Sequence, residues 1–403
     1  GDHHYLGATM CSQIPRVRHM RRWTNAQSAP PQFGEDRHDT NRPQNAAQDP
    51  AVTNPPNVIP NAAERDAIPQ PIEWKRYSTP SVFVFERRYR PHPVLCGGEL
   101  GVIDVLPDHP HEGWVYEDHE VRLDAEYSYG DQCGRDFPEI DGVRPTPEVI
   151  AWSDSLGDPP YNFAKRETPA RRFGQIGVYD GDEIDHDRVI VDSTWHHWMD
   201  LNLNGLEAAA DDTDFQKIAR YFRNCAVWLA REGQRRRMLT YTSWMTVLRA
   251  SLFEDLSLSQ SVFELGGVGL DVIGREASDC FTSEWVYIFV PRDLHEKLRL
   301  PMRSKGPIWA LPHPELANQA VMGGILKSMI QIRDELIQRG DRKAFETEAL
   351  DKHLEKAMQE GAQAGLDAFD EALTENADLL APVREPCRFK ALWKEAWAEL
   401  QRD

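Results

Sequence analysis

The sequence of 403 residues has few cysteines, no long apolar run and no excess of basic residues. Its six cysteines are scattered without CxxC spacing, which argues against zinc ribbons and against a disulfide framework. A reducing compartment is the simpler expectation, so we predict a cytoplasmic protein. No run approaches the roughly 18–20 apolar residues that a membrane-spanning helix needs, and we therefore expect no membrane span.

Charge of one sign dominates the chain. There are 65 acidic residues against 46 lysines and arginines, a formal net charge of −19. Phosphate backbones repel such a chain, so we expect no nucleic-acid partner. The longest basic cluster, Arg235–Arg237, precedes an apolar pattern and is typical of the solvated start of a helix.

Length and composition predict three regions, since 403 residues allow two or three domains of about 100–200 residues each. We expect an α/β domain over 1–205, a helical hairpin with a small strand region over 206–300, and an acidic helical region over 301–403. Within the first region, 25–71 holds nine prolines and almost no large apolar residue. This composition predicts an insertion without regular secondary structure.

Short apolar runs predict the strands of the first region, at 81–89, 101–107, 148–152, 174–180 and 188–193. Most of them end in Asp, Gly or Pro, which indicates polar loops at their carboxyl ends. In open α/β sheets that edge binds ligands.

Helical periodicity dominates the rest of the chain. It predicts a hairpin of two helices over 214–232 and 236–256, with a further strand over 284–291. It also predicts a long helix over 316–339, an acidic helix or helix pair over 341–385 and a last short helix over 389–400. The expected apolar stripes are Phe215, Ile218, Phe222 and Leu229 on the first helix, Leu239, Met245, Leu248 and Leu252 on the second, and Ile325, Met329, Ile332 and Leu336 on the long helix.

Histidines and carboxylates gather in four clusters, which would share one cleft if their strands are neighbours. Imidazole and carboxylate together can bind a divalent metal or perform general acid–base work. The clusters are Asp2, His3 and His4; His92 with Cys96; Asp108, His109, His111 and Glu112; and Asp192, His196 and His197.

Each cluster also has a purely structural interpretation. His109 and His111 flank a proline, as in an ordinary turn, and Cys96 can be a buried structural cysteine instead of a nucleophile beside His92. Of the adjacent pair His196 and His197, we expect one to face the cleft and the other to pack, because consecutive residues point to different sides.

The order of these segments resembles the class I glutamine amidotransferase-like fold, in its ThuA-like branch. The resemblance rests on "GDHHYLGA" at the start, on "HPVLCGGELGVIDVLPDHPHEGWVYE" and on "GQIGVYDGDEIDHDRVIVDSTWHHW", and covers about residues 1–205. It implies a three-layer flavodoxin-like sheet that is incomplete at the N-terminus of this chain. The elbow that carries a nucleophilic cysteine in amidotransferases offers Asp2 and His3 here, so glutaminase activity is not carried over.

Two functions follow as hypotheses. The first is a hydrolase-like enzyme that acts on a small polar substrate, either with or without the assistance of a divalent metal. In this hypothesis, "TWHHW" lies at the carboxyl end of a central parallel strand. The alternative is a catalytically inactive scaffold or assembly subunit with a protein partner, which can form oligomers through the helical C-terminal region. For the enzyme, the catalytic candidates are His196, His197, Asp2, His3 and Asp192, the substrate-binding candidates are Trp195, Trp198 and Asp108, and the metal candidates are His109, His111 and Glu112.

Overall fold

The computed structural model describes ten segments of the chain and four further positions. These are 14–23, 70–80, 87–106, 113–129, 131–155, 171–193, 211–249, 260–276, 314–340 and 348–375, with 203, 206, 207 and 286. The chain divides into two compact units: a sheet unit, Gly1–Arg76 with Pro91–Arg231, and a helical unit, Tyr77–Arg90 with Glu232–Asp403. The first helix of the predicted hairpin therefore belongs with the sheet and the second with the other helices.

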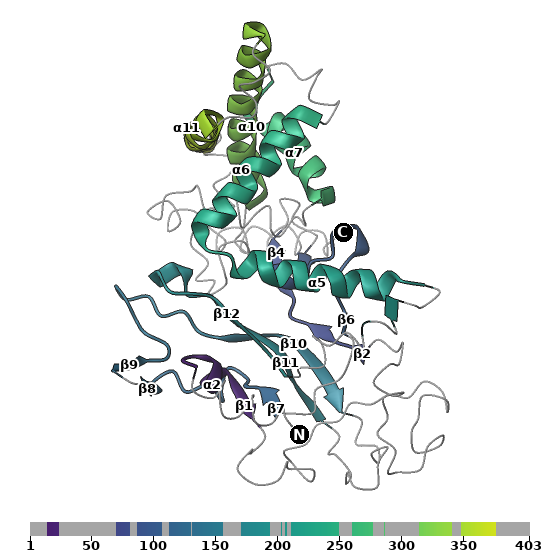
Figure 1. Cartoon of the computed structure of the whole chain (residues 1–403), viewed down its shortest axis with the longest axis vertical. Coiled ribbons are helices and arrows are strands. Elements are labelled where there is room, and N and C mark those ends of the chain that lie inside the picture. The colour runs from purple at the N-terminus through teal and green to yellow at the C-terminus, as the bar shows by residue number, and fades with distance from the viewer. Residues whose placement is uncertain are drawn as a thin grey trace, which may run out of the picture. The chain divides into compact units, whose positions relative to one another are not determined.

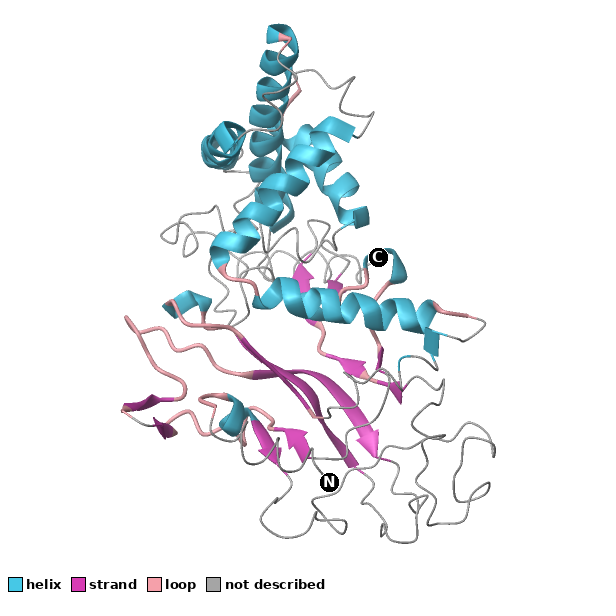
Figure 2. Ribbon diagram, viewed as in Figure 1, coloured by secondary structure: helices cyan, strands magenta, loops and turns pink. Residues whose placement is uncertain are grey.

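The sheet unit is built on a six-stranded antiparallel sheet, so the fold is mixed α/β (Figure 2). Its long central strands β10 and β11 match the strands predicted over 148–152 and 174–180. The order is β1 (Arg21–Trp23), β7 (Gly113–Val115), β11 (Arg171–Tyr179), β10 (Glu148–Ser155) and β3 (Glu73–Trp74), with β12 (Val189–Asp192) also paired to β11.

The strand predicted over 188–193 is present as β12, but the prediction that it is parallel is wrong. β12 runs antiparallel to β11, with Ile176 opposite Asp192 and Tyr179 opposite Val189. The two strands are joined by a short link that contains the 3-10 turn Asp182–Ile184. Parallel neighbours need a crossover of about a dozen residues or more, whereas a short link returns the chain antiparallel. All pairs among the described strands are antiparallel, so a flavodoxin-like layering is not confirmed in them.

Three two-stranded sheets complete the β structure. β2 (Gln70–Pro71) pairs with β6 (Val105–Leu106), and β8 (Glu126–Tyr129) with β9 (Gln132–Arg135). In the helical unit, β4 (Tyr77–Pro80) pairs with β5 (Arg87–Arg90). Of the insertion predicted to be irregular over 25–71, the last two residues form β2, and 25–69 lie outside the described part of the chain. Of the strand predicted over 284–291, only Val286 is described, and it is helical.

Helix α5 (Thr213–Leu229) packs against β12 and β6 in the sheet unit (Figure 1). Its buried stripe is rotated from the predicted one. Leu229 is 45% exposed and Phe215 and Phe222 are only half-buried, so of the four expected residues Ile218 alone is in the core. The buried residues follow a spacing of three and four that is typical of one helix face: Ile218, Tyr221, Cys225 and Trp228.

The helical unit contains α6 (Glu232–Arg249), α7 (Val262–Glu276), α10 (Pro314–Arg339) and α11 (Glu348–Glu375). α10 packs against the other three helices, and it confirms the long helix predicted over 316–339. α11 confirms a helix in the acidic stretch, but that helix is not solvated all round. One face is buried through Leu354, Met358, Ala362, Leu366 and Phe369. None of the described helices is long and apolar enough to cross a membrane.

Glycines allow the helices of this unit to approach closely. A Cβ added at Gly361 of α11 would lie 2.6 Å from the backbone oxygen of Gly324 in α10. Gly266 and Gly323 meet backbone atoms of Gln319 and Val262 in the same way, across α7 and α10. Gly266, in the glycine-rich run at 266–274, is thus part of a helix interface, and a larger residue at this position would force the backbones apart.

Candidate functional site

Asp192 is the one member of the predicted site that lies among the described residues. Ten other candidates lie outside them: Asp2, His3, Asp108, His109, His111, Glu112, Trp195, His196, His197 and Trp198. Whether these side chains converge in one cleft therefore stays a prediction. The described residues around Asp192 show what this carboxylate contacts.

Asp192 is the last residue of β12 and is held by two neutral donors. Its Oδ1 accepts a hydrogen bond from Nε2 of Gln175 at 3.2 Å, and its Oδ2 accepts one from the Tyr221 hydroxyl at 3.2 Å. Oε1 of Gln175 in turn accepts from the Ser153 hydroxyl at 2.8 Å. This polar chain joins β10, β11 and β12 to α5. Ser153, Gln175 and Tyr221 are buried, so the bonds satisfy groups that would otherwise be costly to bury.

The pKa values of two groups near Asp192, the Tyr221 hydroxyl and the Cys225 thiol, are raised. Burial above all, with the neighbouring Cys225 and Asp192 groups, raises the pKa of Tyr221 well above its usual range. Burial likewise raises the pKa of the Cys225 thiol to about 12. Only the thiolate is a good nucleophile, so Cys225 is inert at neutral pH. Tyr221 and Cys225 serve the packing of α5 on the sheet.

The histidine and cysteine of the "RPHPVLC" cluster are also built into the interior. His92 precedes the 3-10 turn Pro93–Leu95, and its Nδ1 accepts a hydrogen bond from the Val94 amide at 3.3 Å. Its ring meets Trp228 edge-on at 5.2 Å between centroids. Burial lowers the pKa of His92 to about 3, so the ring is neutral at physiological pH.

Cys96 is buried at the end of the same turn, as a free thiol. Nδ2 of Asn224 donates to the backbone oxygens of both Val94 and Cys96, at 3.0 and 2.8 Å. This side chain fastens the turn to α5. The geometry favours the structural cysteine over a nucleophile paired with His92.

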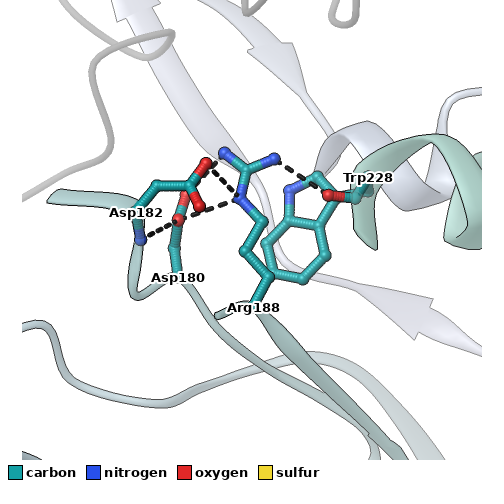
Figure 3. A network of polar contacts seen from close by, with 4 residues as sticks. All are labelled: Asp180, Asp182, Arg188 and Trp228. Atoms are coloured by element: carbon teal, nitrogen blue, oxygen red, sulfur yellow. Dashed lines mark hydrogen bonds and ion pairs between the residues drawn. The ribbon is translucent and has the colours of Figure 1, made fainter. Parts of the chain in front are cut away.

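A network around Arg188, which the sequence reasoning missed, lies beside this turn (Figure 3). Arg188 binds Asp180 through two hydrogen bonds, Nε to Oδ1 at 2.9 Å and Nη2 to Oδ2 at 3.0 Å, and its Nε is 3.2 Å from Oδ2 of Asp182. Its Nη1 donates to the backbone oxygen of Trp228 at 3.0 Å. The side chain of Arg188 is only 7% exposed, while those of Asp180 and Asp182 are 39% and 31% exposed.

The sequence did contain a signal for this network. "DGDEIDHDR" places several carboxylates and one arginine in the tight link between two strands, and Asp185 there adopts a left-handed conformation. Arg188 joins the two ends of the link through its two hydrogen bonds with the Asp180 carboxylate. Guanidinium groups favour this two-point geometry. The network orders the link.

A second charged centre lies at Asp136, which is fully buried. Its Oδ2 is 3.1 Å from Nε of Arg18 and 3.4 Å from Nε2 of His19. Burial lowers the pKa of His19, and the Asp136 carboxylate opposes that shift. The centre ties α2 (Val17–Met20) to the chain that follows β9.

Among the described residues, no group of three or more His, Cys, Asp or Glu side chains is placed to hold a metal ion. Comparisons with protein-family models, with curated proteins and with solved structures found no match.

Proposed function

We propose that the chain acts as a non-catalytic scaffold or assembly subunit. The observation that carries this proposal is the polar chain from Ser153 through Gln175 and Asp192 to Tyr221. One oxygen of the Asp192 carboxylate holds α5 through Tyr221, and the other accepts from Gln175 within the sheet. A carboxylate occupied in this way is a structural fastener first.

His92, Cys96 and Cys225 support the same proposal. His92 is buried and neutral, and the thiols of Cys96 and Cys225 are buried. A general base or nucleophile needs a matched pKa and access to a substrate. None of these three groups meets both needs, whereas all three pack against the turn or helix that they support.

A second candidate is the hydrolase-like enzyme implied by the resemblance to the amidotransferase-like fold. One observation favours it: Asp192 is held at the end of β12, four residues before His196 and five before His197. A fixed carboxylate can orient an imidazole and raise its basicity. A divalent metal would be sought at His109, His111 and Glu112. A flavodoxin-like layering, if it accompanies this activity, requires parallel pairs outside the described strands.

Elemental analysis and a mutant pair separate the two candidates. The full chain, and its His196→Ala and His197→Ala variants, are analysed for bound metal and melted in parallel. The scaffold predicts no stoichiometric metal, and variants that differ from the parent at most in melting temperature. A stoichiometric ion that one variant loses without any change in melting temperature would establish the enzyme instead.

A further inference from the structure

Helix α6 has apolar residues on both of its faces. One face packs in the helical unit through Leu239, Trp244 and Val247, which are all buried. On the opposite face Met238 is 37% exposed, Tyr241 47% and Leu248 37%. Surface helices normally keep that side polar, so the second apolar face calls for an explanation.

The exposed residues form one continuous stripe together with Met245, which is half-buried. Met238, Tyr241, Met245 and Leu248 follow a spacing of three, four and three, which places them on the same side of the helix over three turns. We call these four residues the α6 stripe. Scattered apolar residues on a surface need no explanation, but an aligned and contiguous set marks an interaction surface.

The tyrosine in the stripe is fixed in place. Its hydroxyl donates to Oδ1 of Asp351, at the start of α11, at 2.8 Å. On the buried side, the Thr240 hydroxyl donates to the backbone oxygen of Arg236 at 2.9 Å. A stripe held on a packed helix loses little conformational entropy on binding, which favours affinity.

Basic residues bracket the stripe. Arg237, directly before the stripe, and Arg249, directly after it, lie on the exposed side of α6, and neither is in an ion pair with a described residue. Arg236, by contrast, is 2.8 Å from Glu232. No acidic side chain lies between Arg237 and Arg249 on α6, although the chain as a whole carries −19. The stripe is therefore an apolar surface with an arginine at each end, and the Asp351 carboxylate that meets it accepts the hydrogen bond of the Tyr241 hydroxyl.

We propose that the α6 stripe docks an acidic amphipathic helix of a partner protein, an inference that rests on the assembly function proposed above. Apolar residues of the partner at positions i, i+3 or i+4, and i+7 would cover the stripe, as in other helix-in-groove complexes. Its carboxylates would meet Arg237 and Arg249. This charge match sets the orientation and the association rate more than the affinity.

A second copy of the chain fits this surface less well. Two chains of −19 repel each other. The acidic helix available among the described residues, α11, already buries its apolar face through Leu354 and Met358. It can offer carboxylates to another copy but no free apolar stripe.

The test uses two labelled helical peptides with the full chain. Both carry leucines at helix-face spacing, one flanked by glutamates and the other by lysines at the same positions, and binding is followed by fluorescence anisotropy. We expect the glutamate peptide to bind about tenfold more tightly at low salt and to lose most of this preference at 1 M salt, because the Debye length is then only about 3 Å.

Variants locate the binding site. Arg237→Glu combined with Arg249→Glu should reverse the preference in favour of the lysine peptide, and Met238→Ala combined with Leu248→Ala should weaken both peptides. Ile337→Ala is the matched control, because Ile337 is 62% exposed on α10 and stands outside the stripe. Arg237→Gln with Arg249→Gln, which abolishes the preference without adding charge, replaces the reversal variant if that variant fails to melt cooperatively.

Several outcomes would overturn the inference. Equal binding of the two peptides, or an unchanged preference in the charge variants, removes the role of the arginines. Binding of vesicles of anionic lipid in place of the peptide makes the surface a membrane contact, and a stripe-dependent dimer in sedimentation makes it a self-association face. Any of these can occur while the chain lacks a stoichiometric metal, so failure here is distinguishable from failure of the scaffold proposal.

Discussion

Arg188, in the link between β11 and β12, caps the carboxyl end of α5. Its guanidinium donates to the backbone oxygen of Trp228 at 3.0 Å and lies over the ring of the same residue, 4.6 Å from its centroid. The positive charge also meets the negative end of the helix dipole. One side chain thus combines an ion pair, a cap and a cation–π contact, and it makes the packing of α5 on the sheet depend on the link 180–188.

Arg188→Ala should therefore destabilise the chain strongly. It removes a nearly buried charge and takes the guanidinium away from Asp180 and Asp182, but those carboxylates are partly exposed and regain some hydration. We expect a loss of about 2–3 kcal/mol, at or below the low end for a broken buried pair. Arg188→Lys should recover only part of it, since lysine cannot make the two-point contact. Urea unfolding at neutral pH measures both changes.

The control for Arg188 is Lys356→Ala. Lys356 and Glu360 form an exposed pair one turn apart on α11, with side chains 72% and 66% exposed. Pairs of this kind are worth about 0.3–0.5 kcal/mol. Equal losses for Arg188→Ala and Lys356→Ala would contradict a central role for the Arg188 network.

Because of His92, the free energy of unfolding should decrease as the pH is lowered below 6.5. Its pKa is about 3 in the folded chain and 6.5 in the unfolded one, so the unfolded state binds a proton first as pH falls. Stability from this group is complete above pH 6.5 and is lost progressively below it. The loss is about 2 kcal/mol at pH 5 and approaches about 5 kcal/mol near pH 3, at 1.36 kcal/mol for each unit of pKa.

His92→Asn is the variant that tests this dependence. Asparagine retains an acceptor for the Val94 amide but does not titrate. Its free energy of unfolding should be lower than that of the parent at pH 7, with a flatter decline between pH 6.5 and 4. If parent and variant lose stability in parallel over that range, His92 is not the group responsible.

Local patterns predicted the elements better than their arrangement. The apolar runs at 148–152, 174–180 and 188–193 are strands, and the periodic stretches near 214, 316 and 348 begin helices, because these signals are local. Strand direction depends on the length of the link before β12, and the analogy with parallel α/β sheets overrode that simple cue. The buried face of α5 was misjudged because Tyr221 and Trp228 outweigh Phe215 and Phe222 in the core.

The site was less accessible to prediction. Asp192 was identified from its place after a strand, but its partners Gln175 and Tyr221 come from elements that no spacing rule connects. The Arg188 network is short-range, and its charge pattern was visible in the sequence. Met245 and Leu248 were expected on one apolar stripe with Leu239, but only Leu239 is buried, and the other two belong to the α6 stripe. Periodicity shows that a face is apolar but does not show what covers it.

Removal of residues 341–403 should affect the two units differently. α11 packs on α10, with Gly361 and Gly365 against the backbone of Ile325 and Val321, so its loss uncovers this buried face of α10. We expect the helical unit to melt at a lower temperature and the strands β10 and β11 to keep their protection from hydrogen exchange. Circular dichroism with hydrogen exchange separates these effects. Loss of protection in β10 and β11 would show that the acidic region supports the sheet after all.

The last prediction concerns the contact between α10 and α11. Gly361→Ala adds a methyl group 2.6 Å from the backbone oxygen of Gly324, closer than Cβ atoms normally come to backbone oxygens. The two helices have to separate, which costs about 1–3 kcal/mol in a packed interior, while alanine returns up to about 1 kcal/mol of helix propensity.

Gly233→Ala provides the matched control for Gly361→Ala. Gly233 lies in the first turn of α6, and a Cβ there would meet nothing within 4 Å. The same substitution should then be neutral or stabilise by up to about 1 kcal/mol. Thermal and urea unfolding of the full chain should place the two variants on opposite sides of the parent. If Gly361→Ala is as stable as Gly233→Ala, the helices have room to spare, and the glycines of α10 and α11 do not set their separation.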